Sequence, residues 1–193
     1  MSEFWLYVKL GITHVLDWTA YDHVLFLVVL TVGYPAAAWR KLLLLVTAFT
    51  VGHTVSLIAT HYDIVQVDAA WVEFLIPITI LAAALYTIFT AYKPADHKKG
   101  WWLYFITLFF GVIHGFGFGR YFNMINQDGG LTPLFEFALG IELSQVIVVF
   151  VVVVLGSLLH FFFRILAGRN PKREIPLPRS TFAETLAERH FCR

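Results

Sequence analysis

Long uninterrupted apolar segments constrain the fold of this chain more than any other feature. Residues 40–60, 69–92 and 100–118 each approach or exceed the ~20 mostly apolar residues that a membrane-spanning helix needs. A fourth segment, residues 133–165, would reach roughly 50 Å as a straight helix, so we expect it to be tilted or broken near Gly140 or Gly156. Only 14% of the 193 residues are charged, against about 25% in soluble domains, which excludes an ordinary soluble protein.

Two shorter apolar segments precede these four. We interpret residues 4–17 and 21–36 as two further spans, with a re-entrant pair as the alternative where protein covers the backbone. The sequence therefore predicts an all-α, polytopic membrane helix bundle of about six transmembrane helices. We expect residues 1–168 to form this bundle and residues 169–193 to form a polar tail.

The distribution of basic residues predicts the orientation of the bundle. With six spans, twelve of the fourteen lysines and arginines fall on one face, and only Lys9 and Arg120 lie elsewhere. By the positive-inside rule this face is cytoplasmic, which predicts that both termini and the tail are cytoplasmic. We expect a multi-pass protein of the bacterial inner membrane, in contact with membrane lipids.

Charge and cysteine content exclude other classes of partner and site. The net charge of +1 gives no reason to expect a nucleic-acid partner. The single cysteine, Cys192, excludes a disulfide or a cysteine-based metal site within one chain. The sequence leaves open whether the chain forms a homo-oligomer.

Eight polar or ionisable residues interrupt the apolar segments. Because they are costly in a bilayer, such groups usually face the interior of the bundle and carry function. With helices that alternate in direction, all eight fall in the outer half of the membrane. They are His14, Asp22, His23, His53, Ser56, Glu73, His114 and Glu142.

Four histidines with three carboxylates and no thiolate indicate a nitrogen/oxygen metal site. Imidazole suits nickel, zinc and related ions, and a carboxylate adds a harder donor. The candidate ligands are His14, Asp22, His23, His53, His114 and Glu142. We expect Glu73, Gln145 and Ser56 to support these ligands through hydrogen bonds. The alternative is that each histidine only joins two helices.

A serine near histidine and carboxylate groups also raises the possibility of catalysis. Ser56 lies three residues after His53 and so on the same helix face. If the chain is an enzyme, Ser56, Asp22 and Glu142 are the candidate catalytic residues. The alternative is that the Ser56 hydroxyl binds the preceding turn of its own helix.

These motifs, taken together in chain order, resemble those of the HupE/UreJ family of hydrogenase and urease accessory membrane proteins. The resemblance covers roughly residues 10–150. The matching segments are Gly11-Ile-Thr-His14, Tyr21-Asp22-His23-Val-Leu-Phe26, Thr47-Ala-Phe-Thr-Val-Gly-His53-Thr-Val-Ser56-Leu, Val72-Glu73, Gly111-Val-Ile-His114-Gly-Phe-Gly-Phe-Gly119 and Leu139-Gly-Ile-Glu142-Leu-Ser-Gln145.

The resemblance implies a nickel or cobalt permease. It implies functional roles for His14, Asp22 and His23, and for His114 and Glu142 in the later motifs. One spacing differs from that of the family, because seven residues rather than five separate His14 from Asp22. Two extra residues would turn a helix by about 200°, so His14 reaches the same site only if a loop absorbs them.

Three functions remain open from the sequence. The first is a permease that captures nickel, zinc or cobalt from the external side. The second is an intramembrane metal-dependent hydrolase acting near the outer leaflet. The third is a structural or assembly subunit. The cytoplasmic half of the bundle is poor in ionisable groups, which weakens the permease hypothesis unless hydroxyls and backbone carbonyls line the route.

Overall fold

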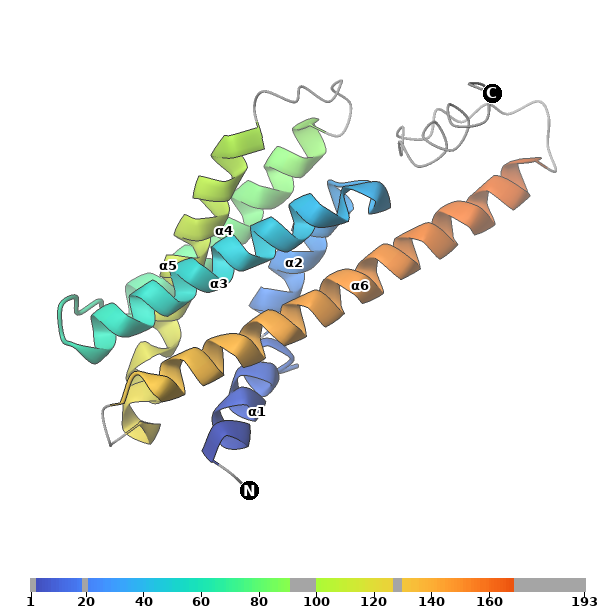
Figure 1. Ribbon diagram of the computed structural model, residues 1–193. Helices are drawn as coiled ribbons and strands as arrows, with labels where there is room; N and C mark the ends of the chain where they lie inside the picture. Colours follow the sequence, from blue (N-terminus) through green and yellow to red (C-terminus); the bar gives the residue numbers. More distant parts are fainter. Residues whose placement is uncertain (1–2, 19–20, 91–99, 127–129, 169–193) are drawn as a thin grey trace.

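The computed structural model describes residues 3–18, 21–90, 100–126 and 130–168, and within them the chain is all-helical (Figure 1). The predicted all-α bundle of about six helices is confirmed, and four of the described helices are long and apolar enough to span a membrane. A short 3₁₀ turn, η1, joins the second and third helices. The elements are α1 (Glu3–Val15), α2 (Asp22–Val32), η1 (Ala36–Ala38), α3 (Trp39–His61), α4 (Ala69–Thr90), α5 (Gly100–Ile125) and α6 (Thr132–Gly168). The predicted tail, residues 169–193, lies outside the described residues.

Helices α3 and α5 form the centre of the bundle and run in the same direction in close contact. Gly52 lies against the backbone of Leu108, and Gly111 lies against the backbone of Phe49 and His53. A Cβ atom at either glycine would overlap a carbonyl oxygen of the facing helix. Small residues let the backbones of membrane helices approach in this way. The glycine-rich stretch of α5 therefore fixes α3 and α5 relative to each other.

Helices α1 and α2 do not form a hairpin but follow one another through the thickness of the bundle (Figure 1). Tyr7 on α1 packs against Phe122, near the end of α5. At the other end of the pair, Gly33 lies beside Thr87, and the Thr87 hydroxyl donates to the carbonyl of Val29, near the end of α4. Helix α1 packs mainly on α6, and α2 packs on α4 and α6. The two short helices therefore lie at different depths.

The lengths of these two helices explain the arrangement. With 13 and 11 residues they are about 20 Å and 16 Å long, and neither alone spans the ~30 Å hydrocarbon core. Together they are long enough for one crossing that is interrupted in the middle. The other four helices, α3 to α6, are each long and apolar enough to span.

The broken crossing changes one part of the predicted topology. Helices α2 to α6 alternate in direction as expected, and the start of α3, the end of α4 and the start of α5 share the basic face. Helix α1 runs opposite to the prediction, so its N-terminal end lies toward the face where α5 ends and α6 begins (Figure 1). The prediction that both termini share one face therefore does not hold for the N-terminal end of α1. The physical reason is that α1 ends at Val15 and α2, which begins at Asp22, continues in the same general direction (Figure 1).

Helix α6 is one continuous helix of 37 residues, about 55 Å long, and is inclined to α4 and α5 (Figure 1). Of the two expected alternatives, tilt or break, it is not broken at either glycine. Gly140 instead lies against Val8 and Gly11 where α1 crosses α6, and a Cβ atom at Gly156 would meet no atom of another element within 4 Å. The first half of α6 is thus the part that packs on the bundle and carries Glu142 and Gln145.

Candidate metal centre

Four histidines meet in the middle of the bundle, at the interruption between α1 and α2. His14 lies in the last turn of α1, and His23 lies in the first turn of α2. His53 and His114 come from the middle of α3 and α5. We call these four residues the histidine cluster. The imidazoles of His23, His53 and His114 are 3% exposed or less, and His14 is partly exposed, so three of the four histidines are inside the protein.

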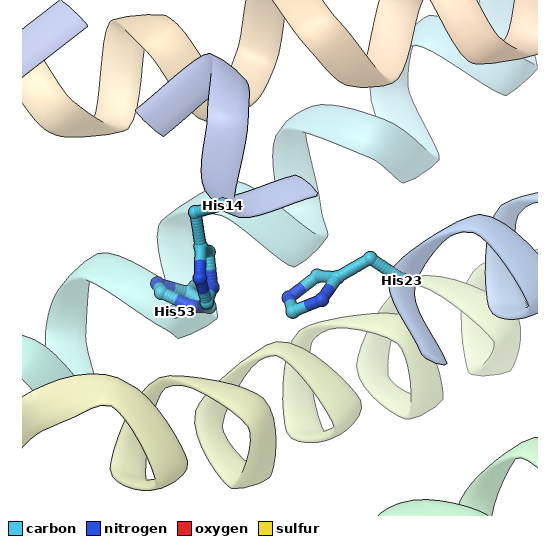
Figure 2. A group of neighbouring side chains, drawn as sticks. All are labelled: His14, His23 and His53. Carbon is cyan, nitrogen blue, oxygen red and sulfur yellow. The ribbon is translucent and has the colours of Figure 1, made fainter. Parts of the chain in front are cut away.

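Three of the four rings are turned toward a common point. Figure 2 shows His14, His23 and His53 pointing toward one another from three different helices. One ligand nitrogen from each lies within 4.8 Å of the others. Metal–nitrogen bonds of ~2.0–2.1 Å in a tetrahedral site correspond to nitrogen–nitrogen separations of roughly 3.3 Å. A small inward rotation of the rings would therefore let one ion bind all three.

The fourth histidine lies just beside this group. The ring centroid of His114 is 5.0 Å from that of His23. Its Nδ1 donates to the carbonyl oxygen of Phe110 at 2.8 Å, which leaves Nε2 with a free lone pair. A backbone partner of this kind commonly fixes the tautomer of a metal-binding histidine.

Asp22 connects two of the histidines. One carboxylate oxygen is 3.2 Å from Nδ1 of His23, and the other is 3.8 Å from Nε2 of His114. The first contact holds His23 with Nε2 as the free nitrogen. Asp22 thus orients the ring of His23 and would add negative charge beside a cation bound by these histidines.

Several ring nitrogens of the cluster have no hydrogen-bond partner. They are Nε2 of His14, His23 and His114 and both ring nitrogens of His53. Buried polar atoms are nearly always hydrogen-bonded, so unpartnered nitrogens that share one interior space need another partner. A divalent transition-metal ion fits this donor set, because neutral imidazole is its common protein ligand.

Aromatic side chains close the cluster toward the basic face of the bundle. Phe26, Phe49 and Phe110 pack on one another, with ring centroids 5.3 Å apart for Phe26–Phe49 and for Phe26–Phe110. Phe49 also contacts the ring of His114 at 5.3 Å. Since Phe110 precedes His114 by one helical turn, this inner aromatic layer lies between the histidines and the face where α3 begins.

A second layer closes the opposite side. Phe118 lies one turn beyond His114 and stacks on Phe137 with centroids 5.0 Å apart. His14 packs on Phe118 at 4.0 Å, and His53 packs on Phe137 at 6.2 Å. The histidine cluster is therefore enclosed between two aromatic layers.

The remaining predicted site residues lie apart from the cluster. Glu142 and Gln145, on α6, both contact Thr50, which is one turn before His53 on α3. Ser56 donates to the carbonyl of His53 at 2.8 Å, within its own helix. Glu73 is exposed on α4. The structure thus brings together His14, Asp22, His23, His53 and His114, and separates Glu142 and Gln145 from them by about one helical turn.

Sequence reasoning missed Thr47 and Thr50, which contact Glu142. The signal that would have found them is their spacing, because Thr47, Thr50 and His53 follow at intervals of three residues and share one face of α3. It also missed the two phenylalanine layers, whose members are distributed over four helices.

Comparison with known protein families identifies the family of this chain. The family model described as HupE / UreJ protein matches residues 1–170. The chain belongs to the HupE/UreJ family. The match includes every residue of the histidine cluster and both residues of α6 that contact Thr50. The comparisons with curated proteins and with solved structures gave no match. This HupE/UreJ protein is thus a membrane protein of a family linked to nickel and cobalt handling, with a group of histidines that can bind a metal ion.

Proposed function

We propose that this chain is a permease for a divalent transition-metal ion of the nickel type in the bacterial inner membrane. The histidine cluster binds the transported ion, with His14, His23 and His53 as its nearest ligands. His114 and Asp22 complete or support the coordination. Nickel, cobalt and zinc are all compatible with these donors, since imidazole binds each of them.

The observation that carries the proposal is the position of the unpartnered histidine nitrogens at the break between α1 and α2. Transporters often place their ion sites near the middle of the membrane, where a spanning helix is interrupted. The C-terminal end of α1 brings partial negative charge toward this point, and the N-terminal end of α2 brings partial positive charge. The preference for a cation therefore comes from the imidazoles and from Asp22.

Enclosure of the cluster favours transport over hydrolysis. A hydrolase must admit both a substrate and water to the metal, and here phenylalanine rings cover both sides. The hydroxyl of Ser56, the candidate nucleophile, is bound to a carbonyl of its own helix. A permease requires such an enclosed state, because an ion that is open to both faces would leak.

Binding of nickel by the purified protein tests the site. We expect wild type to bind about one ion per chain, and His53→Ala and His114→Ala to weaken binding by at least about tenfold. His61→Ala is the matched control, since His61 also lies on α3 but contacts Asn123 outside the cluster. Wild type without saturable binding, or His53→Ala and His114→Ala with wild-type affinity, would show the metal site to be wrong.

Nickel uptake by cells tests whether the protein transports the ion. Radioactive nickel should enter cells that express wild type faster than cells without the gene. Cells that express His53→Ala should take up nickel no faster than cells without the gene. Uptake that is unchanged by deletion of the gene, with nickel and also with cobalt and zinc, would argue against a permease.

A further inference from the structure

Four side chains that carry oxygen atoms lie close together between α3 and α6, outside the histidine cluster. Thr47 donates to one carboxylate oxygen of Glu142 at 2.6 Å, and Thr50 donates to the other at 2.5 Å. The Thr50 oxygen is also 2.9 Å from Oε1 of Gln145. We call Thr47, Thr50, Glu142 and Gln145 the oxygen cluster. No nitrogen of a histidine takes part in these contacts.

The oxygen cluster contains an unpaired charge and an incompletely paired amide. The Thr50 hydroxyl is in contact with Glu142, Gln145 and the carbonyl of Val46, the last at 3.3 Å. Gln145 is fully buried, and its Nε2 has no partner; with the amide exchanged, the nitrogen would donate to Thr50 and the oxygen would lack a partner instead. Among the described residues, no basic side chain forms an ion pair with Glu142. A cation bound beside these oxygens would neutralise the carboxylate.

The oxygen cluster lies between the histidine cluster and the basic face. Thr50 and Thr47 precede His53 by three and six residues, which corresponds to about 5 Å and 9 Å along α3. On α6, which runs the other way, Glu142 and Gln145 follow Phe137, the residue that contacts His53. Both helices thus lead from the histidines to the oxygens in the same direction.

A direct route along α2 and α5 is closed. There the inner aromatic layer of Phe26, Phe49 and Phe110 separates His23 and His114 from the basic face. On the side of α6, by contrast, Thr47 is exposed and Glu142 is only half-buried. A carboxylate that faces hydrocarbon has a high free-energy cost. We therefore expect water rather than lipid beside the exposed side of Glu142.

We propose that the oxygen cluster is a second cation site, which receives the metal ion from the histidine cluster and passes it toward the basic face. This inference rests on the proposed permease function and extends it. One carboxylate and three neutral oxygens bind a transition-metal ion more weakly than three or four imidazoles. Weaker binding suits a site of release, because conduction requires that an ion can leave each site.

Binding of Mn²⁺ to the purified full-length protein tests the site independently of transport. Manganese prefers carboxylate, carbonyl and water ligands, and its binding is measured by electron paramagnetic resonance. We expect Mn²⁺ to bind wild type and His53→Ala alike, and Glu142→Gln and Thr50→Val to bind it at least about tenfold more weakly. Thr54→Val is the control for Thr50→Val, because Thr54 only donates to the carbonyl of Thr50. Loss of Mn²⁺ binding in His53→Ala, together with retention in Glu142→Gln, would overturn the proposal.

Nickel entry into proteoliposomes tests the role in transport. Glu142→Gln and Thr50→Val should retain nickel affinity within about twofold of wild type and lower the entry rate at least about tenfold. If wild type carries nickel and both variants carry it at the same rate, a second site on the route is refuted. If wild type carries none while Mn²⁺ binding still depends on Glu142, the permease fails and the oxygen site stands. Thermal unfolding of each variant verifies that the bundle remains folded.

Discussion

A single methyl group at Gly115 should disrupt the metal site without removing any ligand. A Cβ atom there would lie 2.5 Å from the carbonyl oxygen and 3.0 Å from the Cα of His53, and it would overlap the hydroxyl of Ser56. Ordinary contacts of this kind are about 3.5 Å, so α3 must retreat by about 1 Å at His53. Backbone atoms cannot rotate aside as a side chain can.

The expected magnitude follows from two separate effects. Overpacking of a well-packed interior costs about 1–3 kcal/mol of stability. Metal–ligand distances tolerate errors of only about 0.2 Å, so a 1 Å shift of His53 should weaken nickel binding at least about tenfold, or about 1.4 kcal/mol. We therefore expect Gly115→Ala to lower both the unfolding temperature and the nickel affinity.

Two other glycines provide controls for this measurement. Gly117→Ala would place its Cβ 3.3 Å from a methyl group of Val72 and near no backbone atom of another helix, and Gly156→Ala would meet no atom within 4 Å. Both should bind nickel as wild type does and change stability by less than about 1 kcal/mol. The measurements are isothermal titration calorimetry with nickel and thermal unfolding in detergent. Wild-type nickel affinity in Gly115→Ala would refute the idea that close contact of α3 and α5 positions His53.

Three further predictions follow from the site. Ser56→Ala should retain nickel binding and uptake, because its hydroxyl only binds the carbonyl of His53; loss of uptake with normal folding would restore Ser56 as a functional residue. Glu73→Gln should leave the nickel affinity measured by calorimetry unchanged, since Glu73 is exposed on α4, and a tenfold change would contradict its separation from the site. Nickel at about a hundred times its dissociation constant should stabilise wild type by about 2.7 kcal/mol in thermal unfolding, and the same nickel concentration should stabilise His53→Ala by about 1.4 kcal/mol or less.

The sequence predicted the helices well and the path of the first two poorly. Apolar length identifies α3 to α6 because each segment is long enough to span on its own. The segments that became α1 and α2 are each too short, and hydropathy alone does not say whether a short segment crosses, returns or continues the previous one. That choice depends on packing, here on Gly11 of α1 against Gly140 of α6.

The break between α1 and α2 also explains how His14 reaches the site despite its altered spacing from Asp22. The two extra residues between His14 and Asp22 would displace His14 on a continuous helix. In the structure α1 ends at Val15, so the extra residues lie in the connection and do not rotate the ring away. The sequence could identify the histidines by their cost in a bilayer, but it could not separate them from Glu142. Residue counting along helices gives depth to within about one turn, and one turn is the distance between the two clusters.

The broken crossing itself can be tested by labelling from each side of the membrane. If α1 and α2 share one crossing, Glu3 and the α3–α4 connection lie on the same face, while Lys41 lies on the other. In a background with Cys192→Ser, an impermeant maleimide added outside should label Glu3→Cys and Gln66→Cys and should spare Lys41→Cys, given that the basic face is cytoplasmic. Labelling of Glu3→Cys from the same side as Lys41→Cys would mean that α1 crosses separately. His14 would then lie near a membrane face rather than at the meeting point of α1 and α2, and the enclosed histidine cluster would lose its first ligand.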